Sequence, residues 1–289
     1  MKYSSNSILA YAPHNKEGEK IIKQSLFFRE GLKKRIFLID FIKSSSIMPA
    51  LFQSKKQQEL QEKALLKYRQ FVKDTIQNEL PKEILFRIKS GDPASALINE
   101  SKKGGYEFII IDKSNAGYRG GLSYNDMCKF ISKSHCPVLT INKDYPVEQI
   151  NKIIIPIDIS QAIKKKLYWS TLFAKKFNAK IHIVSALNID IKEKGSLAHK
   201  NAEKIKNMLH ERGLDCDFKI LKTHQRPKHD VILDYIDEEK PELVIIRTHK
   251  EFRFSGKKAG KFVSEIIYRS KVPVFSVGGV TTFKPEDIK

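Results

Sequence analysis

The stretch LVIIRTHKEFRFSGKKAGKFVSEIIYRSKVPVFSV, residues 243–277, decides the fold of this chain. It opens with an uninterrupted apolar run at 243–246, which is typical of a strand buried on both faces. After a polar loop, residues 260–269 show the apolar spacing of a helix, and 274–277 form a second apolar strand. Strand, helix and strand in this order predict a βαβ unit. Ligands of such sheets bind beyond the carboxyl ends of the strands, so the loop 247–259 and the following helix start form the candidate site.

The rest of the chain repeats this alternation. Strands are predicted at 7–12, 35–42, 84–88, 108–111 and 138–141, and again at 152–157, 180–184, 218–221, 243–246 and 274–277. Helices are predicted at 17–30, 56–80 (ended by Pro81), from Pro93, and at 126–134, 160–177, 195–213, 229–236 and 260–269. Equivalent landmarks such as Ser134 and Ser270 are 136 residues apart, which indicates a duplicated domain. We predict an α/β fold of two tandem Rossmann-like domains, 1–145 and 146–289, each with a five-stranded, mostly parallel sheet flanked by helices on both faces.

The composition is that of a folded globular protein, with 41% hydrophobic and 30% charged residues. No apolar run approaches the roughly 18 residues of a membrane-spanning helix, and the first residues lack the apolar core and cleavage site of a signal peptide. We therefore expect a cytoplasmic protein with no membrane contact. Cys128, Cys136 and Cys216 show neither CxxC nor Cys/His ligand spacing, so we expect reduced thiols and no metal site.

The net charge of +20 is spread evenly along the chain. Residues 1–146 hold 25 basic and 15 acidic residues, and the remainder holds 28 and 18. A basic run such as residues 164–166 falls on the expected polar side of a helix. Because there is no basic tail and no basic stripe interleaved with aromatic residues, we expect a solvated lysine-rich surface and not a nucleic-acid partner.

Several segments resemble the universal stress protein family, and the whole chain resembles a tandem universal stress protein. The segments are IIIPIDIS with Asp158, SGDPASAL at 90–97, LVIIRTH at 243–249, and the strand-five sequences HCPVLTI and KVPVFSV. Their order recurs in both halves, so the resemblance covers nearly the whole chain. It implies five-stranded parallel α/β domains, dimeric association, a stress-response role without catalysis and, in some members, ATP binding.

The resemblance also implies where a nucleotide would bind. Binding members carry an Asp after strand one that faces the ribose, and a G-x2-G-x9-G pattern followed by Ser or Thr around the phosphates. Glycines allow main-chain N–H groups to approach phosphates, and the third stands at a helix N-terminus. In the second half this pattern aligns without gaps, with Arg247, Lys250 and Gly260 at the glycine positions. The candidate nucleotide- or anion-binding residues are therefore Asp158, Ala186, Arg247, His249, Lys250, Gly260 and Lys261.

Two interpretations of these substitutions remain open. Long cations at two glycine positions take up the volume that phosphates need, which predicts that ATP does not bind in the family manner. Alternatively, Arg247, Lys250 and Lys261 hold a smaller or differently placed anion through charge-assisted hydrogen bonds. Asp158 either contacts a ribose or caps its own loop. No cofactor is predicted, with ATP or another phosphate-bearing ligand as the alternative.

The first half departs further from the nucleotide-binding pattern. Pro13 replaces the ribose-binding Asp, and Phe41 replaces the small residue beside adenine. Asp112, Asn115 and Asn125 align with the three glycines, and Asp126 with the Ser/Thr position. Because carboxylates repel a triphosphate, we predict that this half does not bind ATP.

The sequence offers no reaction. No P-loop or dinucleotide fingerprint follows a strand, and no Ser or Cys nucleophile has a base at readable spacing. We predict a non-catalytic stress-response protein that acts through protein contacts or a small anionic ligand, with an unknown protein partner and with self-association, as an intramolecular pseudo-dimer or a homodimer. The alternative is a nucleotide-binding protein or slow nucleotide hydrolase that uses the second half.

Overall fold

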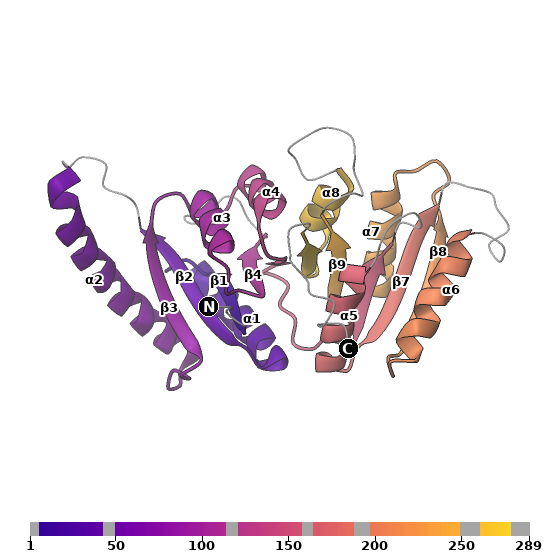
Figure 1. The fold of residues 1–289 in the computed structure, drawn as a ribbon, viewed down its shortest axis with the longest axis horizontal. Coiled ribbons are helices and arrows are strands. Elements are labelled where there is room, and N and C mark those ends of the chain that lie inside the picture. Colours follow the sequence, from indigo (N-terminus) through magenta and orange to yellow (C-terminus); the bar gives the residue numbers. More distant parts are fainter. Residues whose placement is uncertain are drawn as a thin grey trace. The chain divides into compact units, whose positions relative to one another are not determined.

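The computed structural model describes residues 6–42, 50–113, 121–157, 164–187, 197–248 and 261–278, without the side chains of 50–57, 164–165 and 197–198. The chain divides into two compact units, Met1–Pro146 and Val147–Lys289 (Figure 1). Each unit has its own run of parallel strands connected by helices.

Strands and helices alternate through the described part of the first unit. They are β1 Ser7–Tyr11, α1 Lys16–Leu32, β2 Arg35–Ile42, α2 Ala50–Ile76, β3 Ile84–Ser90, α3 Pro93–Lys103, β4 Phe108–Asp112, α4 Tyr124–Lys133 and β5 Val138–Ile141. The strands lie in the order β3-β2-β1-β4-β5, and every pairing between them is parallel.

The second unit repeats this arrangement. Its elements are β6 Lys152–Pro156, α5 Lys164–Phe177, β7 Lys180–Leu187, α6 Leu197–His210, β8 Cys216–Lys222, α7 Lys228–Glu239, β9 Leu243–Arg247, α8 Lys261–Arg269 and β10 Val274–Val277. The strand order is β10-β9-β6-β7-β8, again with parallel pairing. The predicted fold, two five-stranded parallel α/β halves, is confirmed.

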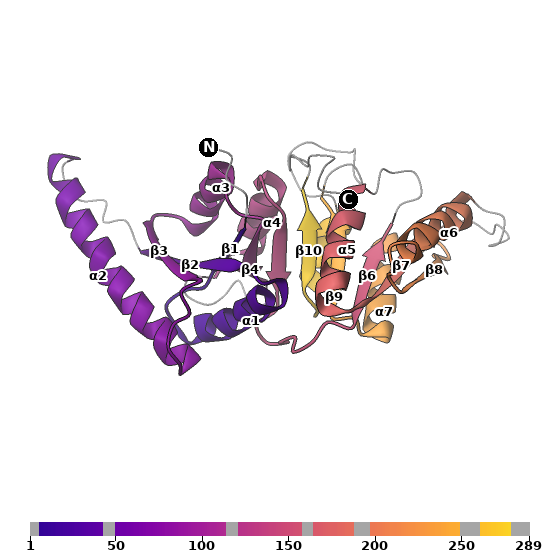
Figure 2. The ribbon, with the colours of Figure 1, turned by 60° about the horizontal axis from the view of Figure 1, so that its bottom comes forward.

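Helices cover both faces of each sheet (Figure 2). In the first unit α1 packs against α2, and α3 packs against α4. From β1 the chain runs outward to β2 and β3, with α1 and α2 as the connecting helices. It then returns to β4 and β5 through α3 and α4, which cover the opposite face (Figure 2). The connection therefore changes direction between β1 and β4, and between β6 and β9 in the second unit. Ligands of open α/β sheets bind at the carboxyl ends of the two strands on either side of this switch point.

The strands are buried because their apolar residues run without interruption. Ile8, Leu9 and Ala10 of β1 are fully buried, as are Ile109 and Ile110 of β4. Each fully buried Ile or Leu side chain contributes about 1.5–3 kcal/mol to folding. A sheet held in this way presents its strand ends at fixed positions.

Both predicted ends of α2 are wrong. The helix expected at 56–80 runs over Ala50–Ile76, so Pro81 does not end it. Gln77 adopts the left-handed conformation with φ 57°, and its N–H donates to the carbonyl of Lys73 over 3.0 Å. A residue in this conformation closes a helix by the same bond that a glycine commonly makes, and nothing in the type of Gln77 indicates it.

Candidate functional site

The two switch points define two candidate edges. The first edge comprises residues 12–15 after β1, the last residue of β4 with the one that follows it (112–113), residues 142–144 after β5, and the first turn of α1. The second edge comprises Ile157 after β6, Arg247 and Thr248 at the end of β9, and the start of α8. Both edges lie where the fold brings strand ends and helix N-termini together.

The structure describes three of the seven predicted site residues. Ala186 is 4% exposed in β7, where it pairs with Leu221 of β8. Arg247 is half-buried at the last position of β9, in register with Val277 of β10. Lys261 is exposed at the first position of α8. Asp158, His249, Lys250 and Gly260 lie outside the described residues, so their assignment stays a prediction.

Hydrogen bonds fix the end of β9 in the second edge. The N–H of Thr248 donates to the carbonyl of Val277 over 3.0 Å, and the Thr248 hydroxyl donates to the same oxygen over 3.2 Å. The side chain is 7% exposed. The position of Arg247 is therefore set by its own strand and by the following residue.

A buried lysine lies beneath the second edge. Lys166 is 2% exposed, and its Nζ donates to the carbonyl oxygen of Pro156 at the end of β6 over 2.8 Å. The sequence predicted that the basic run at residues 164–166 lies on the polar side of its helix, and this prediction is wrong for Lys166. Lys166, Ser170 and Phe173 follow i, i+4, i+7 spacing and share the buried face, which is the signal that could have found it.

In the first edge, α1 begins directly against the end of β1. Asn15 caps the helix by accepting the N–H of Gly18 over 2.9 Å. A Cβ on Gly18 would lie 1.7 Å from the carbonyl oxygen of Pro13, so the helix approaches as closely as only glycine allows. The buried hydroxyl of Tyr68 donates to the carbonyl of Ala12 over 2.7 Å. These contacts hold the chain where the resemblance places a ribose.

Aromatic and acidic side chains occupy the region next to Phe41. The ring of Phe41 packs edge-on against Tyr11, with 5.1 Å between centroids. Asp40 accepts the N–H groups of Phe41 over 2.7 Å and of His14 over 3.2 Å. Burial raises the pKa of Asp40, although both hydrogen bonds act in the opposite direction. The His14 ring in turn contacts the Phe71 ring at 4.5 Å.

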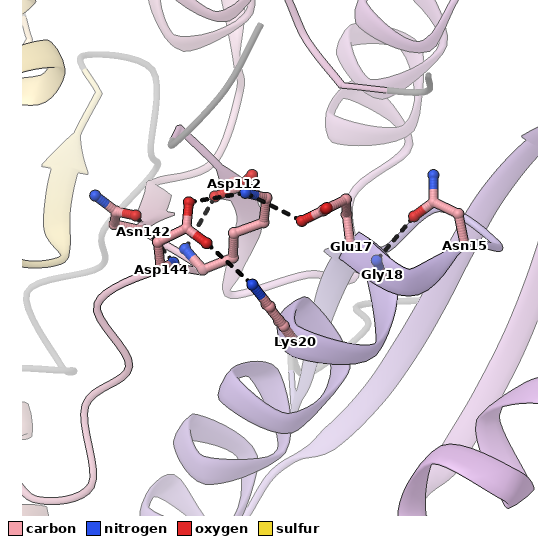
Figure 3. Close-up of polar contacts among 8 residues, drawn as sticks. Asn15, Glu17, Gly18, Lys20, Asp112, Asn142 and Asp144 are labelled. Atoms are coloured by element: carbon pink, nitrogen blue, oxygen red, sulfur yellow. Dashed lines mark hydrogen bonds and ion pairs between the residues drawn. The ribbon is translucent and has the colours of Figure 1, made fainter. Parts of the chain in front are cut away.

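A buried lysine also organises the first edge. The Nζ of Lys143, whose side chain is 5% exposed, lies 3.1 Å from Glu17 and 2.9 Å from Asp144. Lys20 forms a second ion pair with Asp144 at 3.1 Å. Figure 3 shows Glu17 and Lys20 reaching from α1 toward the segment after β5 that holds Asp144. Burial alone would lower the pKa of Lys143, but the two carboxylates and the nearby Asp112 leave it raised.

The end of β4 joins this network. The carboxylate of Asp112 accepts the main-chain N–H of Lys143 over 3.2 Å (Figure 3). Lys113, the next residue, is 8% exposed, and its N–H donates to the carbonyl of Ile141 over 2.8 Å. Burial lowers the pKa of the Lys113 ammonium to about 7, even though Asp112 raises it. Asp112 stands at a glycine position of the nucleotide pattern, and its carboxylate here accepts a hydrogen bond from the main chain of Lys143.

The start of α4 is closed by its own side chains. Ser123 accepts the N–H of Asp126 over 3.1 Å, and its hydroxyl donates to the Asp126 carboxylate over 2.6 Å. This Ser-x-x-Asp arrangement is a capping interaction that satisfies an N-terminal amide of the helix. In the nucleotide pattern the same helix start would face phosphates, and here a carboxylate of the chain occupies it.

The two edges therefore differ in chemistry. The described first edge is filled by ion pairs and caps among its own residues, while the described second edge carries Lys166, Arg247 and Lys261. Sequence reasoning missed the burial of Lys143, which composition and charge do not show, and that of Lys166, which only the helical spacing with Ser170 and Phe173 indicates. Within the described ranges there is no cluster of His, Cys, Asp and Glu arranged for a metal, and no helix long and apolar enough to span a bilayer.

Comparisons with known proteins agree with the fold. The sequence pattern of the Universal stress protein family matches residues 149–278. A universal stress protein from Archaeoglobus fulgidus DSM 4304 is 17% identical with a TM-score of 0.70, over 96% of this chain and 99% of that one. A functionally unknown protein from Pseudomonas aeruginosa PAO1 is 15% identical with a TM-score of 0.62, over 96% and 94%. No curated protein matches the chain.

These similarities extend the resemblance noted in the sequence. The family match covers the second half, and the structural matches cover both halves at identities that show a shared fold. Residues 149–278 therefore match the Universal stress protein family, and the whole chain shares its fold with the universal stress protein structure from Archaeoglobus fulgidus.

Proposed function

We propose that this protein is a non-catalytic, cytoplasmic stress-response protein. It acts through protein contacts, which include self-association, and through a small anion bound at the second edge. It does not bind ATP in the family manner. The first half serves as a domain without a ligand site, and the second half keeps a site of altered specificity.

The first edge carries this proposal. Its Lys143 ammonium is neutralised by Glu17 and Asp144, so little positive charge is left for a phosphate. The amide of Asp126 at the start of α4 is bonded by Ser123. A triphosphate bound here would have to displace contacts that the chain already makes, and it would meet the carboxylates of Asp112 and Asp126.

Positive charge at the second edge supports a small anion there. Arg247 ends β9, Lys261 opens α8, and the Lys166 ammonium lies against the end of β6. A cation at the start of a helix adds to the partial positive charge of the helix N-terminus, which attracts anions. Arginine binds planar oxyanions such as phosphate through two parallel hydrogen bonds.

The same three cations are the observation that favours the alternative, a nucleotide-binding protein or slow nucleotide hydrolase. They would steady phosphate groups, and Asp158 retains the ribose-contact position in the sequence. Phosphate release from ATP by the purified protein, abolished in Lys261→Ala, would favour this function. The absence of any phosphate release would remove it.

Thermal unfolding with added anions tests the proposal. We expect inorganic phosphate to raise the Tm above that in sodium chloride of equal ionic strength, and we expect Lys261→Ala to lose this rise. Magnesium ATP should give little stabilisation beyond that of phosphate. A ligand at 100 times its Kd stabilises by about 2.7 kcal/mol. A saturable ATP effect of that size on the unmodified protein, beyond the effect of phosphate, would overturn the proposal.

A further inference from the structure

A groove lies between α2 and β3, on the far side of the first unit's sheet order from β5. Its volume is about 440 Å³, and its lining includes Glu62 and Leu65 of α2 and Phe86, Arg87, Ile88 and Lys89 of β3. β3 is the outermost strand of this order and pairs on one side with β2. Figure 1 shows α2 running beside β3. The groove therefore opens onto the edge of a sheet.

The main chain of β3 presents hydrogen-bonding groups at this edge. At the two ends of the strand, the carbonyl of Glu83 accepts from Ile36, and the N–H of Gly91 donates to Ile42. In a parallel ladder alternate residues face the same neighbour, so the odd-numbered residues of β3 turn their N–H and C=O groups to β2. Phe86 and Ile88 consequently turn theirs away from β2, where an added strand would bind them.

The two faces of β3 differ in character. On the α2 face, the centroid of the Phe86 ring lies 6.2 Å from that of the Tyr68 ring. The Arg69 guanidinium lies over the Phe86 ring, 6.0 Å from its centroid. On the opposite face, the guanidinium of Arg87 stacks over Phe37 at 4.6 Å. A strand added beside β3 would thus meet Phe86 and Ile88, next to both apolar and polar side chains of α2, on one face, and Arg87 and Lys89 on the other.

The charged face has an excess of cations. The Glu100 carboxylate, 3% exposed, binds Arg87 at 3.0 Å and Lys103 at 2.6 Å and lies 4.0 Å from Lys89. These three cations surround one carboxylate. The side chains of Arg87 and Lys89 remain 35% and 41% exposed. One positive charge is neutralised, and the others remain to attract acidic side chains.

This charge decides which kind of strand fits. A second copy of the chain that paired through its own β3 would bring Arg87 and Lys89 close to their equivalents, and like charges on neighbouring strands are destabilising. An acidic strand would gain attraction at the same positions. We propose that the β3 edge binds an extended segment of a partner protein as an added strand, with acidic residues on the Arg87 and Lys89 face alternating with apolar residues on the α2 face.

Three synthetic peptides test this binding mode on the full chain. The probe is a fluorescein-labelled peptide of alternating Glu and Val, and the charge control replaces each Glu by Lys. The third peptide keeps the acidic sequence but carries N-methyl groups on every second amide, which removes main-chain donors without changing charge. By fluorescence anisotropy we expect the acidic peptide to bind at least about tenfold more tightly than either control. Equal binding of the Lys peptide or of the N-methyl peptide would overturn the proposal.

Charge reversal on the protein locates the site. Lys89→Glu should weaken binding of the acidic peptide about tenfold, since it replaces attraction by repulsion. Lys82→Glu makes the same charge change at an exposed residue before β3 and should leave binding nearly unchanged. Hydrogen exchange should show slower exchange of the peptide segment that contains Phe86 and Ile88 when the acidic probe is bound. Equal weakening by both variants, or unchanged exchange in β3, would contradict binding at this edge.

Discussion

The ammonium of Lys143 lies 3.1 Å from the carboxylate of Glu17, and this ion pair joins the segment after β5 to the first turn of α1. The two residues are far apart in sequence, and the parallel topology brings them to one edge of the sheet. Because Asp144 lies 2.9 Å from the same ammonium, the buried cation is held from two elements. The edge where related folds bind ligands is thus closed by the chain itself.

Lys143→Met should destabilise the first unit by about 1–3 kcal/mol, because Glu17 and Asp144 lose a buried partner. The partial exposure of both carboxylates keeps the loss below that of a fully buried pair. Urea unfolding followed by far-UV circular dichroism measures the change. Lys20→Met is the matched control, since Lys20 is 53% exposed and should cost less than about 1 kcal/mol. Equal losses in both variants would contradict a special role for Lys143.

Gly18→Ala should destabilise the protein by about 2 kcal/mol or more, since the new Cβ would collide with the backbone carbonyl of Pro13. A glycine to alanine change inside a helix ordinarily stabilises by roughly 0.5–1 kcal/mol. The expected sign is therefore opposite to that of helix propensity. A higher Tm in Gly18→Ala than in the unmodified protein would show that α1 does not start against Pro13.

Most of the fold could be predicted from sequence, because apolar strands of four to eight residues alternate with amphipathic helices in both halves. β2, β5 and β10 have the predicted bounds. Boundaries set by a left-handed residue could not be predicted, as Gln77 shows. Gln is not a residue type that favours this conformation, so its identity does not mark the end of the helix.

The candidate site was less predictable than the fold. Motif alignment indicates which residues stand at the strand ends, but it does not indicate which side chains bind one another. Asp112 and Asp126 read in the sequence as charges that repel phosphate, whereas in the structure Asp112 accepts an N–H from Lys143 and Asp126 accepts the hydroxyl of Ser123, the N-cap of α4. The Asp112 pairing depends on the end of β4 meeting the segment after β5, which local sequence patterns do not encode. The Asp126 pairing is a local Ser-x-x-Asp pattern, which the alignment with the nucleotide motif did not consider.

Lys166→Met should weaken phosphate binding at the second edge about tenfold, because it removes a positive charge next to the end of β6. The phosphate-dependent rise in Tm should shift to correspondingly higher phosphate concentration. Lys175→Met provides the control, since Lys175 lies on the same helix α5 but is exposed. The same phosphate response in both variants would show that the Lys166 charge does not act on the ligand.

His182 should make the second unit less stable in mild acid. Burial, followed by the charges of Lys152 and Lys180, lowers the pKa of His182 below its usual 6.5. The carboxylates of Glu239 and Asp217 act in the opposite direction but do not outweigh these effects. Below pH 6.5 the unfolded chain binds a proton that the folded chain does not, so stability falls as the pH drops from about 6.5 to the folded pKa. His182→Gln should flatten this dependence in urea unfolding between pH 7.5 and 5. Exposed His135→Gln is the control, and an unchanged slope in His182→Gln would contradict the assignment.

Returning glycines to the loop after β9 should restore ATP binding, if long cations are what exclude the triphosphate. Arg247 and Lys250 stand at two glycine positions of the nucleotide pattern, and Gly260 keeps the third. The double variant Arg247→Gly/Lys250→Gly gives main-chain N–H groups access to phosphates. Magnesium ATP should then stabilise it saturably, by about 2.7 kcal/mol at 100 times Kd.

Lys257→Gly/Lys258→Gly is the matched control for this restoration. It removes the same amount of positive charge from the same loop, but at positions that do not align with the glycine pattern. If both double variants respond to ATP alike, loss of charge or a looser loop explains the effect, and steric exclusion by Arg247 and Lys250 does not. If only the first responds, the volume of those two side chains is what separates this domain from nucleotide-binding relatives. If neither responds, another feature of the second half excludes ATP, and the exclusion cannot be assigned to Arg247 and Lys250.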